Sequence, residues 1–297
     1  MSLPSKAPPD RCGQVAAIYV YPIKSCAGVA VPTWPITQYG FAHDREFLVV
    51  DEHGNFLTQR THPKLALVQP FLEPDVLRLR APDLQEIAVP WFVAPVDDQN
   101  HFKRTATIWR DSVEADDVGD EIAVWFSSHL DFSVRLLRIG SRYRRMIPKE
   151  RVPAVHQHAL GVREVSFADA YPFLIISEAS LADLNRRLSE ALPINRFRPN
   201  IVIADVVDPY AEDRWQTIDI GSLRFRHGGP CVRCVVTTTD QITLERGKEP
   251  LRTLATYRCN EDGGVIFGMN FFCESLAGTI QVGDIIRLLP NEMTDDK

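Results

Sequence analysis

The sequence lacks the features that mark membrane-spanning and secreted proteins. It contains no run of eighteen apolar residues, so neither a transmembrane helix nor a membrane partner is expected. The first ten residues have no apolar core of the kind found in secretory signals, and we expect a disordered leader over residues 1–12. Only 6 of the 297 residues are cysteines, too few for a disulfide scaffold. The simplest location is therefore the cytoplasm.

Basic residues are not in excess either. The 33 lysines and arginines are outnumbered by 39 acidic residues, for a net charge of −6, which argues against a nucleic-acid partner. The chain also has no P-loop, no Gly-x-Gly-x-x-Gly and no Gly-x-Ser-x-Gly element. The enzyme classes that depend on those motifs are thereby excluded.

Proline and turn residues divide the chain into short extended segments. The 21 prolines, against 16 glycines, indicate many turns and edge strands rather than a helical bundle. Short strands at this spacing favour a small barrel or sandwich. The segments predicted as strands are 15–21, 29–36, 47–50, 65–72, 76–79, 87–89, 105–109, 174–176, 201–203, 223–225, 234–238 and 285–289.

Two segments have helical periodicity. Apolar residues recur on one face over 117–130 and again over 177–192. Ser177 is the expected N-cap of the second helix, and Pro193 is expected to end it. The boundary between a strand-rich first part and a mixed second part is expected near residues 130–150.

The most informative stretch is Cys231-Val232-Arg233-Cys234, in which an arginine lies between two cysteines. A thiolate beside a fixed cation suits a soft metal, a persulfide or disulfide exchange. A zinc site needs a second ligand pair at similar spacing, and a thioredoxin-like centre needs a helix where a β-branched run stands, so both are weakly supported. Two buried cysteines that only pack near a turn remain an equally good interpretation.

Cations occur in loops beside two of the predicted strands. Lys24 and Ser25 directly follow the strand over 15–21, where they suit an anionic ligand, although such a pair is usually just solvated. Arg45 precedes the strand over 47–50, and its planar fork suits a phosphate. A surface ion-pair cluster with its charged neighbours is the alternative.

Two further loops in the second part carry polar candidates. Arg198 and Asn200 flank a proline between the best predicted helix and a buried-looking strand, so they either point into a pocket or cap the loop. Asp169 lies in a turn before the strand over 174–176, where an aspartate usually makes local bonds.

Taken together and in this order, these motifs resemble the MOSC family, the molybdenum cofactor sulfurase C-terminal domain proteins. The similarity is greatest to two-part members such as the mitochondrial amidoxime-reducing components and their bacterial relatives, and it extends from about Val15 to about Leu289. The segments that carry it are Tyr-Pro-Ile-Lys-Ser-Cys at 21–26, Asp-Arg at 44–45, Ser-Glu-Ala-Ser-Leu-Ala-Asp-Leu-Asn at 177–185, Arg-Phe-Arg-Pro-Asn at 196–200, Cys-Val-Arg-Cys at 231–234, Gly268, Asn-Phe at 270–271, Gly278 and Val-Gly-Asp at 282–284.

The resemblance implies an α+β, mainly β fold. It would consist of a MOSC β-barrel-like domain with flanking helices plus a smaller N-terminal β-barrel domain. The implied divisions are a leader over 1–12, the N-terminal β-barrel domain over 13–135, the MOSC domain over 136–290 and a tail over 291–297.

The resemblance also implies roles for individual residues. Cys234 would be the molybdenum ligand and a catalytic residue, with Cys231 as its structural neighbour, and a soft thiolate does suit a sulfur-rich molybdenum centre. Asp169 matches an acidic position near the metal and is the candidate proton donor. The residues expected to bind the molybdenum cofactor (Mo-molybdopterin) are Lys24, Ser25, Arg45, Arg198, Asn200 and Val232. For the family as a whole, an association with pyridoxal phosphate binding is also implied.

The implied function is a molybdenum-dependent oxidoreductase. It would reduce small N-hydroxylated compounds, such as amidoximes and hydroxylamines, with loss of water. The cysteine series of the ferredoxin domain found in some relatives is not present, so electrons would come from a separate ferredoxin-like or cytochrome b5-like protein or a reductase. The alternatives are a sulfur carrier or sulfurtransferase with a persulfide on Cys234, and a non-catalytic carrier of the cofactor.

Overall fold

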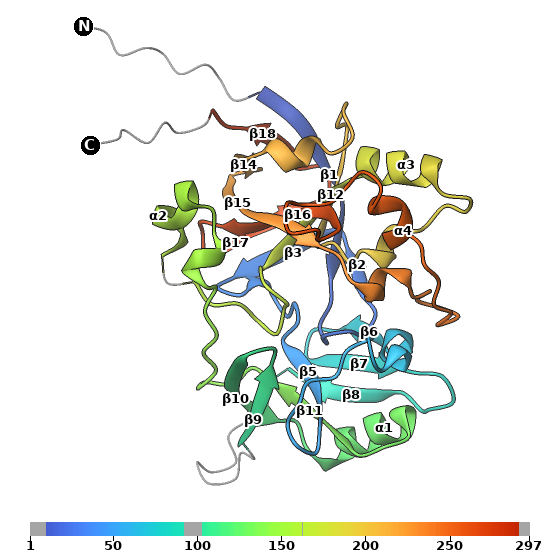
Figure 1. Cartoon of the computed structure of the whole chain (residues 1–297). Helices are drawn as coiled ribbons and strands as arrows, with labels where there is room; N and C mark the ends of the chain where they lie inside the picture. Colours follow the sequence, from blue (N-terminus) through green and yellow to red (C-terminus); the bar gives the residue numbers. More distant parts are fainter. Residues whose placement is uncertain (1–9, 92–102, 162, 291–297) are drawn as a thin grey trace, which may run out of the picture.

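The computed structural model describes residues 10–91, 103–161 and 163–290. These residues form two β-rich parts, one above the other in Figure 1. The tail predicted over 291–297 lies outside the described residues, as does the predicted leader except for residues 10–12, which belong to the first strand.

The upper part is a closed barrel of seven strands. Strand β1 pairs on one side with β18 and on the other with β13, which joins the two ends of the sheet. The pairing of β12 with β13 is parallel, and β2 (Val29–Val31) extends the sheet beside β1. In spatial order the barrel strands are β13 (Ile201–Ala204), β12 (Phe173–Ser177), β16 (Ile266–Cys273), β15 (Leu223–Val232), β14 (Thr217–Ile220), β18 (Ile285–Leu288) and β1 (Asp10–Val20).

Three smaller sheets complete the β structure. The lower part contains a four-stranded and a three-stranded sheet, with helix α1 packed against them, and a further small sheet adjoins the barrel (Figure 1). The four-stranded sheet is β5 (Phe47–Asp51), β11 (Val134–Arg138), β10 (Asp111–Asp117) and β9 (Lys103–Ile108); the others are β6 (Gln69–Leu72), β7 (Val76–Arg80) and β8 (Ile87–Pro90), and β17 (Gly278–Gln281), β3 (Thr33–Thr37) and β4 (Gly40–Phe41).

The helices are short. The α-helices are α1 (Asp120–Leu130), α2 (Gln157–Leu160), α3 (Glu178–Arg187) and α4 (Leu251–Leu254). The 3₁₀ helices are η1 (Pro63–Leu67), η2 (Lys149–Arg151), η3 (Ala154–His156), η4 (Ile194–Arg196), η5 (Ala211–Arg214) and η6 (Val235–Thr238). Across the described parts of the chain, no helix has the length and apolar character needed to cross a membrane.

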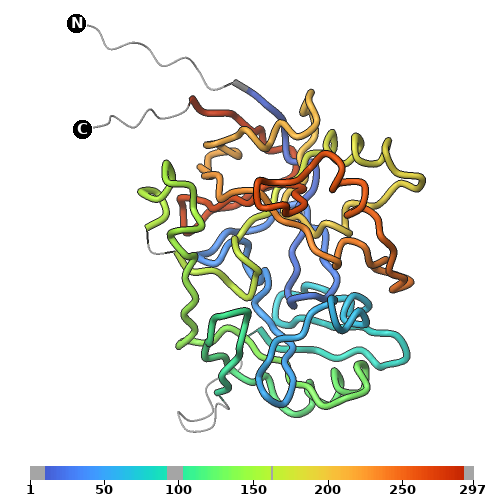
Figure 2. Tube along the Cα trace, viewed as in Figure 1, coloured from blue at the N-terminus to red at the C-terminus, as the bar shows by residue number. Residues whose placement is uncertain are grey.

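The prediction of a mainly β fold that contains a barrel is confirmed. Figure 2 shows the chain beginning in the upper part, passing through the lower part and returning to complete the barrel. The division at residues 135 and 136 stays a prediction, and β1 and β2 belong to the same sheet as the strands from the second half of the chain.

Helix α3 is shorter than predicted. Ser177 is its N-cap, as expected, because its hydroxyl accepts a hydrogen bond from the Ser180 N–H. The helix ends at Arg187, however, and not at Pro193. The Asn185 side chain bonds both the N–H and the carbonyl of Leu192, so the segment after the helix folds back into a loop.

Two predicted strands are partly or wholly helical. The segment 65–72 begins in η1, where Pro63 at the first turn favours helical backbone, and only its end is strand β6. The segment 234–238 is η6 rather than a strand. The hydroxyls of Thr237 and Thr238 donate to the carbonyls of Cys234 and Val235, and these local bonds compete with strand pairing.

Candidate functional site

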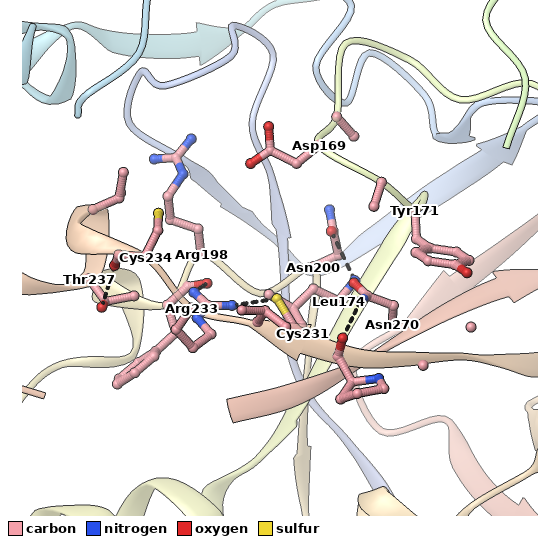
Figure 3. A pocket seen from close by; sticks show the side chains of 18 of the residues that line it. Asp169, Tyr171, Leu174, Arg198, Asn200, Cys231, Arg233, Cys234, Thr237 and Asn270 are labelled. Atoms are coloured by element: carbon pink, nitrogen blue, oxygen red, sulfur yellow. Dashed lines mark hydrogen bonds between the residues drawn. The ribbon is translucent and has the colours of Figure 1, made fainter. Parts of the chain in front are cut away.

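A cavity of about 800 Å³ brings the predicted site residues together. The loops after β1 and before β5, β12 and β13 contribute to its wall, as does the end of β15. Figure 3 shows several of these side chains around it. All eight residues named from the sequence line this cavity: Lys24, Ser25, Arg45, Asp169, Arg198, Asn200, Val232 and Cys234.

Cys234 lies between a strand and a short helix. Strand β15 ends at Val232, and Cys234 is the extended residue that precedes η6. Its carbonyl accepts hydrogen bonds from the Thr237 N–H at 3.1 Å and the Thr237 hydroxyl at 2.9 Å. These bonds fix the backbone, and the half-buried side chain belongs to the cavity wall.

Arg233 is directed toward Cys231. Its Nη1 donates to Cys231 Sγ at 2.8 Å (Figure 3). Its Nη2 donates to the Phe197 carbonyl at 2.6 Å. The sequence left the direction of this cation open. Within the described ranges, no three His, Cys, Asp or Glu side chains are grouped so as to hold a metal ion.

Two arginines contact the ring of Tyr21. The guanidinium carbons of Arg45 and Arg198 each lie 4.3 Å from the ring centroid. Arg45 donates to Asp44 Oδ2 at 2.5 Å, to Asn200 Oδ1 at 3.0 Å and to the Arg198 carbonyl at 3.3 Å. Arg45 is therefore largely satisfied by the protein, and the buried ring of Tyr21 contacts two like charges.

Arg198 retains unused hydrogen-bonding capacity. Its Nη2 is buried and has no partner among the residues that the structure describes. Burial lowers the pKa of Arg198 to about 10, and the neighbouring charge of Arg45 acts in the same direction. The backbone is left-handed, with φ 54°, which is costly for an arginine. A buried donor without a partner is unfavourable, so a bound anion would stabilise this side chain.

Lys24 and Asp169 form an ion pair on the cavity wall. Lys24 Nζ lies 2.5 Å from Asp169 Oδ1 and 2.8 Å from the Phe167 carbonyl. Burial lowers the pKa of Lys24 to about 8, although Asp169 opposes the shift. Burial raises the pKa of Asp169, but Lys24 and Arg60 outweigh it and hold that pKa well below its usual range. Asp169 is therefore ionised at neutral pH, and we expect it to accept hydrogen bonds.

Asn200 and Ser25 are held on the cavity wall by different bonds. The Asn200 carboxamide is buried and already bonded to Arg45, to the Leu174 N–H and to the Tyr19 carbonyl. Because the Asn200 carboxamide is fixed by these bonds, it can orient the Arg45 guanidinium. Ser25 has a left-handed backbone, with φ 70°, and its carbonyl accepts from Gln59, so its loop is held in place.

Sequence reasoning missed several residues that line the cavity or contact its lining residues. Arg60 and Trp109 both contact Asp169, and neither lies in a recognisable motif. Tyr21 was part of a quoted motif, but its contact with two arginines was not evident. Arg151 comes from the arginine-rich stretch after β11, where basic composition was the only signal.

Gly28 allows the Tyr21 ring to occupy its position. A Cβ at Gly28 would lie 2.8 Å from Tyr21 Cδ1 and closer still to Cε1. We expect Gly28→Ala to lower the free energy of unfolding by about 1–3 kcal/mol, because the ring and the two arginines must move. Urea denaturation measures the loss. Gly247→Ala is the control, since its nearest neighbour would be 3.9 Å away, and equal stability of the two variants would contradict the prediction.

Comparison with known proteins gives matches over most of the chain. The model of the MOSC N-terminal beta barrel domain matches residues 12–133, and that of the MOSC domain matches residues 162–287. Mitochondrial amidoxime reducing component 2 of Rattus norvegicus is 36% identical over 289 residues, which cover 93% of this chain and 83% of that protein. Mitochondrial amidoxime-reducing component 1 of Homo sapiens is 36% identical over 295 residues, which cover 94% and 84%.

A third relative is of a different kind. Molybdenum cofactor sulfurase of Arabidopsis thaliana is 33% identical over 275 residues, which cover 85% of this chain but 32% of that protein. Both family models nevertheless match in order, and the amidoxime-reducing components match along nearly the whole chain. The protein therefore belongs to the MOSC family and combines a MOSC N-terminal β-barrel domain with a MOSC domain.

Proposed function

We propose that this protein is a molybdenum-cofactor-dependent reductase of small N-hydroxylated compounds such as amidoximes. The observation that carries the proposal is one cavity with a half-buried cysteine on its wall and a group of cations around it. The similarity to the amidoxime-reducing components supports the same reaction class.

The residues present fit such a cofactor. Cys234 offers the soft thiolate that a sulfur-rich molybdenum centre prefers. The phosphate would be held by Lys24, Ser25 and Arg198, and the unsatisfied Nη2 of Arg198 gains a partner in this arrangement. Arg45, oriented by Asn200, adds charge to the same region. The exposed Val232 on the same wall would offer the pterin an apolar contact.

The bound cofactor would supply the two electrons that cleave the N–O bond. The overall change is R–C(NH₂)=NOH + 2e⁻ + 2H⁺ → R–C(NH₂)=NH + H₂O, so two protons must also arrive. Asp169, ionised and fixed, would accept hydrogen bonds from the substrate N–H or O–H groups and so orient them. The protons would come from another group or from water. A separate electron-transfer protein and a cytoplasmic location stay predictions, as does any binding of pyridoxal phosphate.

The test uses protein purified from a host that makes the molybdenum cofactor. With methyl viologen as artificial electron donor, we expect conversion of benzamidoxime to benzamidine. Protein from a host unable to make the cofactor is the control and should be inactive. Failure of the molybdenum-loaded protein to reduce benzamidoxime would reject the proposed reaction.

The similarity to a molybdenum cofactor sulfurase favours a second candidate. In this alternative Cys234 carries a persulfide, and the purified protein would release sulfur with cyanide while holding no pterin. A non-catalytic carrier would instead hold the pterin and show no reduction. Pterin content, cyanide-labile sulfur and benzamidoxime reduction together separate the three functions.

A further inference from the structure

Trp109 contacts Asp169, a residue of the cavity wall, from a distant hairpin. It lies at the turn between β9 and β10, and its indole Nε1 donates to Asp169 Oδ1 at 3.2 Å. The residue is 48% exposed and has a left-handed backbone with φ 58°. Such a conformation is unfavourable for a large side chain, and strain of this kind persists where the surrounding contacts fix it.

Arg60 contacts both Trp109 and Asp169. Its guanidinium carbon lies 4.6 Å from the centroid of the Trp109 ring, and its Nη2 is 3.5 Å from Asp169 Oδ2. Phe56 packs on the same indole, with ring centroids 5.2 Å apart. Arg60 and Trp109 therefore support each other as they meet Asp169.

Three side chains thus hold the two oxygens of one carboxylate. Lys24 and Trp109 both donate to Oδ1, and Arg60 lies beside Oδ2. The Asp169 side chain is 55% exposed, and with Lys24 alone it would be free to rotate about its remaining bonds. Contacts at both oxygens fix the plane of the carboxylate as well as its position.

We propose that Trp109 and Arg60 are positioning residues for Asp169. The β9–β10 hairpin thereby becomes part of the site, although its family model, over residues 12–133, ends well before Asp169. Asp169 would present a fixed acceptor to a donor group of the substrate. The contact stands on the structure alone, and its effect on catalysis rests on the proposed function.

The contact can be tested without cofactor or activity. The five tryptophans give five indole N–H signals in a ¹⁵N spectrum of the full chain. Trp109→Phe assigns one signal by its loss, and we expect Asp169→Ala to shift that signal and speed its exchange with solvent. The Trp34 signal, assigned in the same way with Trp34→Phe, is the matched control. The Trp34 indole donates to the Ala42 carbonyl, so its signal should not change in Asp169→Ala. A Trp109 signal that Asp169→Ala leaves unchanged would overturn the inference.

A second experiment measures the activity of variants of the cofactor-loaded protein. Loss of one hydrogen bond that orients Asp169 should lower kcat/KM of Trp109→Phe by about tenfold with unchanged Tm. Arg60→Lys should retain more activity than Arg60→Ala, since it keeps the charge. Wild-type kcat/KM in Trp109→Phe would overturn the positioning role. If the wild-type protein is itself inactive, the proposed function fails, while the indole signals still decide the inference.

Discussion

Replacement of Cys234 by serine is expected to abolish molybdenum binding and reductase activity. A serine hydroxyl is hard and stays protonated at neutral pH, so it cannot replace a soft thiolate as a molybdenum ligand. We expect molybdenum to fall to background and kcat/KM to fall by at least about 10³-fold. Elemental analysis and benzamidoxime reduction measure the two effects on the same preparation.

Cys231→Ser is the matched control for this prediction. Cys231 lines the same cavity, but the structure shows its Sγ bonded to Arg233, and a serine oxygen can accept that bond as well. We expect this variant to retain molybdenum and most of its activity. If Cys231→Ser loses the metal and Cys234→Ser keeps it, the assignment of the ligand is wrong.

Replacement of Arg198 by alanine is expected to weaken retention of the cofactor by about 10- to 100-fold. This range corresponds to the loss of a charge-assisted hydrogen bond, roughly 1.5–3 kcal/mol. Fluorescence of the released pterin after washing at increasing salt measures retention, and the variant should lose the cofactor at lower salt than the wild type.

Two features make the Arg198 prediction specific. The apo protein should keep its stability, because the side chain has a buried unsatisfied Nη2 and lies close to the like charge of Arg45. Arg198→Lys should fall between wild type and alanine, since it keeps the charge without the fork. Arg214→Ala, at an exposed arginine outside the cavity, is the control. Wild-type retention in Arg198→Ala would contradict the assigned role.

Local pattern predicted much of the fold. The apolar β-branched run over 47–50 forms β5, and Ser177 caps α3 as expected. Closure of the barrel was not predictable in this way, because β1 and β13 are paired from opposite halves of the chain. The segment 234–238 was predicted wrongly because its β-branched composition favours a strand, while its threonine hydroxyls bond the preceding carbonyls.

The candidate site, like the fold, was predictable from the sequence only in part. The eight residues taken from the motifs, from Lys24 to Cys234, all lie on the cavity wall, but Arg60 and Arg151 of the same wall were missed. Motif order did not predict the direction of Arg233, the contact of two arginines with the Tyr21 ring or the contact of Trp109 with Asp169. Each of these depends on which side chains the tertiary fold brings within a few ångströms, and no local spacing encodes that.

The central claim is that this cavity holds a molybdenum cofactor through Cys234. The most direct measurement is the molybdenum and pterin content of wild-type protein freshly purified from a host that makes the cofactor. The account predicts both in stoichiometric amounts relative to the chain. Protein from such a host that contains neither molybdenum nor pterin would contradict it.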